Sequence, residues 1–223
     1  MIEGEHALLV EAALPVCAQY GLALAGGYAI KAHGLVTRPS DDVDFATGHS
    51  APVEEITEAL ADAYRHFGFD VHVLRASGRK GHLDVGLPSG AAYRVDVLKE
   101  PLNHSPTMMS FVPVLALADA VALKVGALHD RGLIRDVIDV HGAAQVFSEP
   151  DLVAMGRAAL DDGEFQLENL RDQLDRALMY PDEEFAEYDC DPVQSAQIRA
   201  WAQAWAARLN MEIAEAGQWP DGE

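Results

Sequence analysis

The residues best suited to chemistry lie in one short segment, residues 25–45, which reads AGGYAIKAHGLVTRPSDDVDF. Gly26 and Gly27 precede a helix-like stretch, and a strand-like stretch then presents Asp42 and Asp44. Carboxylates two residues apart on a strand point to the same face, so both can bind one or two divalent cations. Glycines just before a helix let main-chain N–H groups approach a phosphate, which the helix dipole also favours. The segment therefore predicts a site for a metal-bound phosphate compound.

An α/β lobe is expected to position this segment, because helix-like and strand-like stretches alternate over the first hundred residues. Apolar periodicity predicts three helices, at 5–20 (with a kink or break at Pro15), 28–33 and 52–67. Alternating patterns and Gly-containing turns predict strands at 22–25, 42–45, 69–75, 82–87 and 92–98. A Pro-containing connector at 101–113 leads to a helical region, with helices expected at 114–130, 133–146, 151–160, 164–179 and 192–216. We therefore expect an α/β lobe over 1–105 and a C-terminal helical lobe over 106–223.

Composition and the N-terminal sequence indicate a cytoplasmic protein without a membrane span. Hydrophobic residues make up 49% of the 223, yet no apolar run approaches the ~20 residues that a transmembrane helix needs. Glu3 and Glu5 stand where a signal peptide requires positive charge. Cys17 and Cys190 lie far apart, which suits a reducing compartment and excludes a thiolate zinc site. The histidines lack metal-ligand spacing, and neither a Gly-x-Ser-x-Gly elbow nor a Walker loop occurs.

The charge is strongly acidic, with 16 Lys and Arg against 36 Asp and Glu, a net of −20. Such a field repels bulk nucleic acid and favours cationic partners or a metal-bridged nucleotide, although solubility alone can account for it. The exception is the turn around Arg75, Arg79 and Lys80, the one concentrated basic patch. This turn either contacts an RNA backbone or is a solvated hairpin tip.

Gly-Gly followed by Asp-x-Asp in strand–helix–strand order resembles the nucleotidyltransferase superfamily, which has the polymerase-beta-like fold. The resemblance implies an α/β (α+β) lobe with a mixed sheet flanked by helices, followed by a helical lobe. It also implies a third carboxylate on a later strand. Asp96 is favoured for this role and Asp84 is its competitor, because strand order should bring Asp96 beside the first pair. Asp41 lies three residues before Asp44, so on a strand its side chain should face away from that of Asp44.

The resemblance implies two-metal phosphoryl transfer, with NTP as co-substrate and Mg²⁺ (or Mn²⁺) as the metal. Asp42 and Asp44 would hold metal ions that bridge the triphosphate, and Asp96 would complete the second site and help to deprotonate the attacking hydroxyl. The nucleotide would be bound by residues that include Gly26, Gly27, Arg38 and Ser40. Arg38 suits a phosphate contact, and its alternative role is to pair with the acidic residues and hold the loop. Tyr28 departs from the Ser or Thr of many members, which removes a hydroxyl contact or substitutes an aromatic stack on the base.

A second segment, residues 124–140, reads KVGALHDRGLIRDVIDV and is similar to the AbiEii-type pattern Lys-x-x-Ala-x-x-x-Arg-x-x-x-Arg-Asp-x-x-Asp. On this resemblance Lys124 would reach the nucleotide phosphates from the helical lobe. Arg131 and Asp136 would either orient the nucleotide or substrate, or brace the helix pair with an ion pair.

The combined motifs resemble those of AbiEii/AbiGii-type toxin nucleotidyltransferases, and also those of antibiotic-modifying nucleotidyltransferases. The first resemblance implies transfer of a nucleoside monophosphate from an NTP to a hydroxyl, with release of pyrophosphate. In that family the acceptors include the 3′ end of tRNA, and a partner antitoxin is implied. The alternatives are an enzyme that modifies a small cationic, aminoglycoside-like antibiotic, which the net charge favours, and a non-catalytic nucleotide-binding regulatory module.

Overall fold

The computed structural model describes residues 2, 4–160 and 164–216, and it divides the chain into two compact units. The first unit comprises Met1–Gly34 and Ser40–Ala120, and the second comprises Leu35–Pro39 and Val121–Glu223. The expected division fell after residue 105, whereas the structural division falls after Ala120. A five-residue segment of the N-terminal region, 35–39, also belongs to the second unit.

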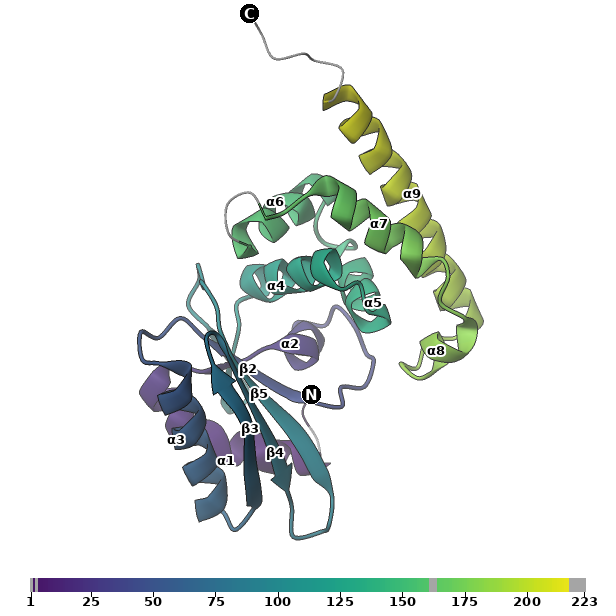
Figure 1. Ribbon diagram of the computed structural model, residues 1–223. Coiled ribbons are helices and arrows are strands. Elements are labelled where there is room, and N and C mark those ends of the chain that lie inside the picture. Colours follow the sequence, from purple (N-terminus) through teal and green to yellow (C-terminus); the bar gives the residue numbers. More distant parts are fainter. Residues whose placement is uncertain (1, 3, 161–163, 217–223) are drawn as a thin grey trace, which may run out of the picture. The chain divides into compact units, whose positions relative to one another are not determined.

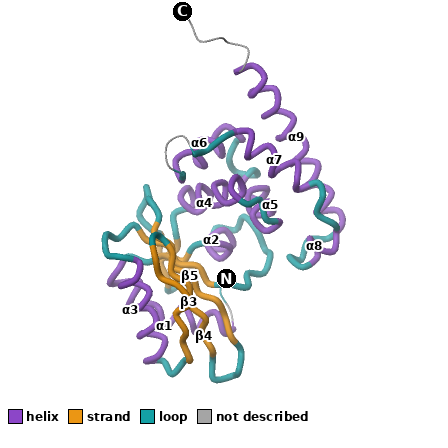
Figure 2. Tube along the Cα trace, viewed as in Figure 1, coloured by secondary structure: helices purple, strands orange, loops and turns teal. Residues whose placement is uncertain are grey.

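The first unit is built around a mixed sheet. Within the described residues its seven strands follow the order β3-β4-β5-β2-β1-β7-β6, and Figure 2 shows the longer strands in orange. The pairing of β2 with β5 and of β1 with β7 is parallel, and the other neighbours are antiparallel. The strands are β1 (Ala23–Leu24), β2 (Val43–Thr47), β3 (Asp70–Ser77), β4 (Lys80–Gly86), β5 (Ala92–Lys99), β6 (Thr107–Met109) and β7 (Val112–Val114). The expected mixed sheet with flanking helices and a helical C-terminal region is confirmed.

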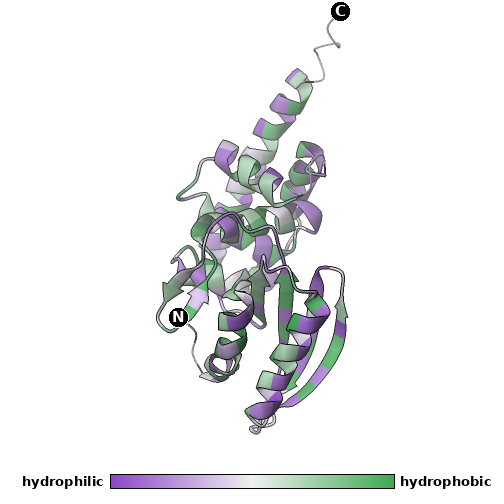
Figure 3. Cartoon of the chain, turned by 90° about the vertical axis from the view of Figure 1, so that its left-hand side faces the viewer, coloured by the Kyte–Doolittle hydropathy of each residue, from purple (hydrophilic) through white to green (hydrophobic). Residues whose placement is uncertain are grey.

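Helices α1 (Gly4–Tyr20) and α3 (Val53–His66) lie together on one face of this sheet (Figure 1). The alternation of apolar and polar residues along the strands, visible in Figure 3, explains why: one side of each strand is made for burial. Leu83 and Val85 of β4 and Val95 and Val97 of β5 are fully buried. Gly81 faces the same helices, because a Cβ there would lie 3.1 Å from Cβ of Thr57 on α3. These odd-numbered positions define the helix-covered face, so the even-numbered positions of β4 and β5 point to the opposite face.

Apart from the segment 35–39, the described residues of the second unit form helices and the loops that connect them. Its helices are α4 (Leu117–Asp130, most of which belongs here), α5 (Ile134–Ala143), α6 (Glu149–Ala159), α7 (Leu167–Ala177), α8 (Asp182–Ala186) and α9 (Pro192–Ala216). Helix α9 contributes one side to the core of this unit, where Ile198, Ala202, Trp205 and Leu209 are at most 3% exposed. No helix in the described part of the chain is long and apolar enough to cross a membrane.

Two local expectations need correction. The break considered at Pro15 is absent, because helix α1 continues through this residue. The carbonyl of Glu11 loses its helical partner, but Glu11 is exposed and its carbonyl can bind water instead. The connector expected at 101–113 contains the β6–β7 hairpin, and Val114 pairs with Leu24 of β1. This hairpin belongs to the sheet of the first unit and moves the division of the chain towards the C-terminus.

Candidate active site: a carboxylate pair and a buried ionic network

Asp44 and Asp96 are neighbours on adjacent parallel strands. Asp44 lies near the start of β2 and is paired in register with Asp96 on β5, so the two carboxylates share one face of the sheet. Asp42 lies two residues before Asp44, immediately ahead of β2. The strand order that favoured Asp96 is present, because β5 is next to β2, whereas Asp84 lies one strand further away, opposite Arg94 on β5.

Gly26 lies against the Asp44 side chain. The peptide N–H of Ala25 donates to the carbonyl of Asp44 at 2.8 Å, which anchors the turn before helix α2 (Gly26–Ala32) to β2. Gly26 has a φ of +56°, and a Cβ there would lie 2.6 Å from Asp44 Cγ while overlapping its Oδ2. A side chain at this position is therefore disfavoured by the backbone conformation and would displace the Asp44 side chain. The glycine that the motif predicted brings the first turn of α2 into contact with a predicted catalytic carboxylate.

Asp96 also contacts His82. The Nδ1 of His82 lies 2.8 Å from Asp96 Oδ1, and the two residues are directly paired across β4 and β5. Both side chains are partly exposed, at 28% for His82 and 19% for Asp96. From the sequence, His82 was one of several scattered histidines and the last residue of the basic turn, and no contact with Asp96 was predicted, although its position two residues before Asp84 in a strand already placed it on the face of Asp84.

The predicted donors are suited to a hard divalent cation. Carboxylate oxygens are the ligands that Mg²⁺ prefers, and Asp42, Asp44 and Asp96 supply six of them. Within the part of the chain that is described, however, no three His, Cys, Asp or Glu side chains converge closely enough to hold an ion. The fit therefore rests on the chemistry of the donors and on the register of Asp44 with Asp96.

In the second unit, Arg38 and Lys124 both bind the buried carboxylate of Asp139. Arg38 donates from Nε and Nη2 to the two oxygens of Asp139, at 2.6 and 2.7 Å, and from Nη1 to its neighbour's carbonyl, that of Pro39. The Nζ of Lys124 lies 2.8 Å from Asp139 Oδ2 and 3.5 Å from Asp136 Oδ1. Arg38 and Lys124 are only 5% and 7% exposed. Of the two roles considered for Arg38, the pairing with carboxylates is present, but its partner is Asp139 rather than Asp42 or Asp44.

Arg131 completes this network by bracing α4 against α5. Its Nε lies 2.8 Å from Asp136 Oδ2, and Asp136 is fully buried. Burial raises the pKa of the Asp136 carboxyl, but the Arg131 hydrogen bond and the Lys124 charge outweigh it and bring the pKa below its usual value. Burial likewise opposes the charge of Arg38, and Asp139 outweighs it and raises the pKa of the guanidinium. Both shifts favour the charged forms of Asp136 and Arg38, and every member of the network contacts a residue of opposite charge.

Tyr28 and Ser40 have local partners. The Tyr28 hydroxyl is hydrogen-bonded to His6 Nδ1 of α1, and burial raises the pKa of Tyr28 to about 12. The Ser40 hydroxyl donates to the carbonyl of Asp42 at 3.3 Å. Gly27 is buried in the first turn of α2. Tyr28 therefore packs as part of the fold in this structure, and Ser40 supports the loop that precedes β2.

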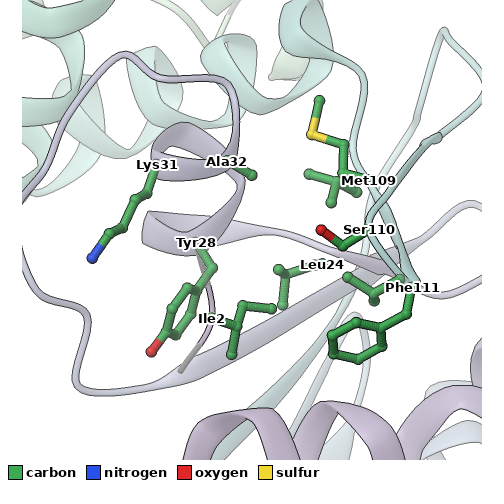
Figure 4. A pocket seen from close by; sticks show the side chains of 10 residues that line it. Ile2, Leu24, Tyr28, Lys31, Ala32, Met109, Ser110 and Phe111 are labelled. Carbon is green, nitrogen blue, oxygen red and sulfur yellow. The ribbon is translucent and has the colours of Figure 1, made fainter. Parts of the chain in front are cut away.

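A small apolar pocket lies beside α2 in the first unit (Figure 4). Leu24, Met109 and Phe111 contribute to its lining together with the ring of Tyr28, whereas the amino group of Lys31 points away from Met109 and Phe111. The residues that line it include none of the three predicted metal ligands. This pocket is separate from the carboxylate pair.

Comparisons with known proteins identify the family and support the fold. A family model described as nucleotidyl transferase AbiEii toxin, Type IV TA system, matches residues 18–217. MenT4, the nucleotidyltransferase toxin Rv2826c from Mycobacterium tuberculosis H37Rv, is similar with a TM-score of 0.54 at 21% identity, covering 96% of this chain and 98% of its own. JHP933 from Helicobacter pylori is similar with a TM-score of 0.53 at 16% identity, covering 97% and 98%. No curated protein matches the chain. At these sequence identities the solved structures show the fold alone, whereas the family model spans most of the chain and shows the family.

Proposed function

Since this chain belongs to the AbiEii nucleotidyltransferase toxin family, we propose that it transfers a nucleoside monophosphate from an NTP to a hydroxyl of tRNA. Nucleotidyl transfer in a toxin–antitoxin context follows from the family. The acceptor, the Mg²⁺ (or Mn²⁺) ions and the roles of individual residues belong to the proposal. The observation that carries it is the register pairing of Asp44 with Asp96, with Gly26 packed against Asp44.

The metal ions, when bound, would neutralise the charge that develops on the α-phosphate and the leaving pyrophosphate. Asp42, Asp44 and Asp96 are the side chains proposed to hold them. Gly26 and Gly27 would offer main-chain N–H groups to the triphosphate at the first turn of α2. Asp96 would accept the proton of the attacking hydroxyl, while His82 holds one of its oxygens.

Arg38, Lys124 and Ser40 are proposed to support nucleotide binding. Lys124 and Arg38 share the Asp139 carboxylate, so a phosphate that approaches Lys124 would have to compete with this carboxylate for its protons. Arg131 and Asp136 would maintain the helix pair that carries Lys124. Tyr28 would act through packing rather than by stacking on a base.

An antitoxin partner is part of the proposal, because the family description names a toxin–antitoxin system. A cytoplasmic location is proposed as well, since NTP and tRNA are present there and Cys17 and Cys190 are both free thiols. The net charge of −20 favours one rival acceptor, a cationic aminoglycoside-like antibiotic. A binding module without catalysis is not favoured, because the family is one of transferases.

The proposal is tested by label transfer. Purified protein is incubated with each α-labelled NTP and Mg²⁺, either with total tRNA or with a panel of aminoglycosides. The double variant Asp42→Ala/Asp44→Ala and a sample with EDTA serve as controls. We expect label on tRNA that both controls abolish. Label on an antibiotic and none on tRNA would establish the rival acceptor.

A further inference from the structure

The face of the sheet opposite α1 and α3 carries a row of four polar side chains over four strands. Asp44 on β2 pairs with Asp96 on β5, Asp96 pairs with His82 on β4, and His82 pairs with Arg75 on β3. Paired residues on neighbouring strands point to the same face. Because Gly81 and its partner Ala76 face α3, Arg75 and His82 must face away from it.

Three cationic side chains lie in this row or beside it. Lys80 lies two residues before His82, Arg94 lies two residues before Asp96, and Arg75 ends the row on β3. All three are exposed, and none forms an ion pair within the described residues, in a protein whose net charge is −20. The Nε of Arg75 donates to the Ser77 hydroxyl at 3.0 Å, which holds the stem of the side chain while the two Nη groups extend beyond it. Exposed cations without an ion pair in an acidic protein are available to an anionic partner.

The charges on this face follow the strands, apart from Asp70 of β3 and Asp84 of β4, which share the face; Asp84 is paired with Arg94, on the other side of the row from Lys80. The carboxylates Asp44 and Asp96 lie towards the centre of the sheet, and the cations Arg75 and Lys80 lie on the outer strands β3 and β4. Neighbouring strands are about 4.8 Å apart, so the backbone of Arg75 lies about 10 Å from that of Asp96. Long Arg and Lys side chains at this separation can reach phosphates one or two nucleotides from a reacting 3′ hydroxyl.

We propose that this face of β3, β4 and β5 binds the phosphate backbone of a single-stranded RNA end. Arg75 and Lys80 contact phosphates upstream of the 3′ hydroxyl, which lies over Asp96, and Arg94 contacts the strand from the other side of the row. The inference rests on the proposed function, since it assigns the surface that receives the acceptor. A cationic antibiotic would be repelled by Arg75 and Lys80, so the surface distinguishes the two acceptors.

The test compares two double variants that remove the same charge. Arg75→Ala/Lys80→Ala removes two cations from the proposed surface, and Arg157→Ala/Arg176→Ala removes two exposed cations from α6 and α7. Binding is measured by fluorescence anisotropy with a short single-stranded RNA that has a free 3′ hydroxyl, over a range of salt concentrations. Label transfer to total tRNA is measured with the same proteins, and thermal melting checks that all of them fold.

For Arg75→Ala/Lys80→Ala we expect at least a ten-fold rise in the Kd for RNA and in the KM for tRNA, with the KM for NTP unchanged. The slope of log K against log salt should become shallower by about 1.4, since each phosphate contact on a single strand contributes about 0.7. The control pair should change each value by less than two-fold. Equal effects of the two double variants would overturn the inference while the proposed function stands. If the wild-type protein labels no RNA, the proposed function fails and the inference fails with it.

Discussion

Replacing Gly26 with alanine should damage catalysis much more than it damages the fold. The new Cβ would lie 2.6 Å from Asp44 Cγ and 2.9 Å from Asp44 Cβ. Carbon atoms in contact prefer separations of about 3.5 Å or more, so the carboxylate must move by about 1 Å. Rotation about χ1 can move the Asp44 carboxylate but not its Cβ, so the turn, which the Ala25 hydrogen bond holds to β2, must also shift slightly. Most of the displacement therefore falls on the carboxylate that we propose to bind metal.

The expected size of this effect follows from the geometry. A misplacement of about 1 Å in a reacting group costs about 10²-fold in rate. The left-handed φ of +56° adds a conformational cost of about 1–2 kcal/mol for alanine, which lowers Tm by about 2–8 °C in a chain of this length. We thus expect kcat for label transfer to fall about 100-fold in Gly26→Ala while the protein remains folded.

Gly34→Ala is the matched control, since Gly34 also has a positive φ, +75°, and a Cβ there would meet nothing within 4 Å. It should lose a similar amount of stability and keep most of the wild-type rate. Thermal melting gives the first quantity and single-turnover label transfer gives the second. If Gly26→Ala transfers label as fast as Gly34→Ala, the position of Asp44 in this structure is not the one that catalysis requires.

Three further outcomes are expected. His82→Asn keeps an N–H donor for Asp96 and should retain most of kcat, whereas His82→Phe should lose about ten-fold in kcat with little change in the KM for NTP, as measured by steady-state kinetics; equal rates of the two variants would contradict a positioning role. Arg38→Ala leaves Asp139 buried without its two guanidinium hydrogen bonds and should lower the free energy of unfolding in urea by about 3–5 kcal/mol, and a loss below about 1 kcal/mol would refute this reasoning. Burial lowers the pKa of the His141 imidazole, so the unfolded chain binds a proton at this residue more readily than the folded chain does. The contribution of neutral His141 to stability is therefore fully present above about pH 6.5, and it is lost as the pH falls further. The Tm of His141→Gln should therefore fall less than that of the wild type between about pH 7.5 and about pH 5.5, and equal falls would mean that other groups dominate.

The elements that position the carboxylates could be predicted from sequence because each has a strong local pattern. Asp44 lies in β2 and Asp42 immediately before it, in a segment whose polar and apolar residues alternate, and the stripe of apolar residues on α3 follows a helical period. The position of Asp96 beside this pair could also be predicted, since the strand order in a fold of this kind places its strand next to that of Asp44.

The β6–β7 hairpin and the place of segment 35–39 in the second unit could not be predicted in this way. The hairpin strands are three residues long and contain Pro113, so they lack the length and alternation that identify a strand. The segment 35–39 joins the helical unit through long-range contacts: Arg38 binds Asp139, and a Cβ on Gly142 would lie 2.5 Å from the carbonyl oxygen of Leu35. Neither contact has a local signature, because the partners are about a hundred residues apart in sequence.

The contact between His82 and Asp96 was missed for a related reason. His82 has no metal-ligand spacing, and only the antiparallel register of β4 with β5 brings it to Asp96. Register between strands is set by the whole sheet and by its turns rather than by either strand alone.

We propose that Asp44 and Asp96, paired across β2 and β5, form the catalytic carboxylate pair. It is tested most directly by comparing Asp96→Asn with Asp84→Asn, since Asp84 shares the same sheet face one strand away. Single-turnover transfer of label from an NTP is measured for both variants at saturating NTP and Mg²⁺. We expect a loss of at least about 10³-fold for Asp96→Asn and of less than about three-fold for Asp84→Asn. A larger loss for Asp84→Asn, or equal losses in the two variants, would contradict it.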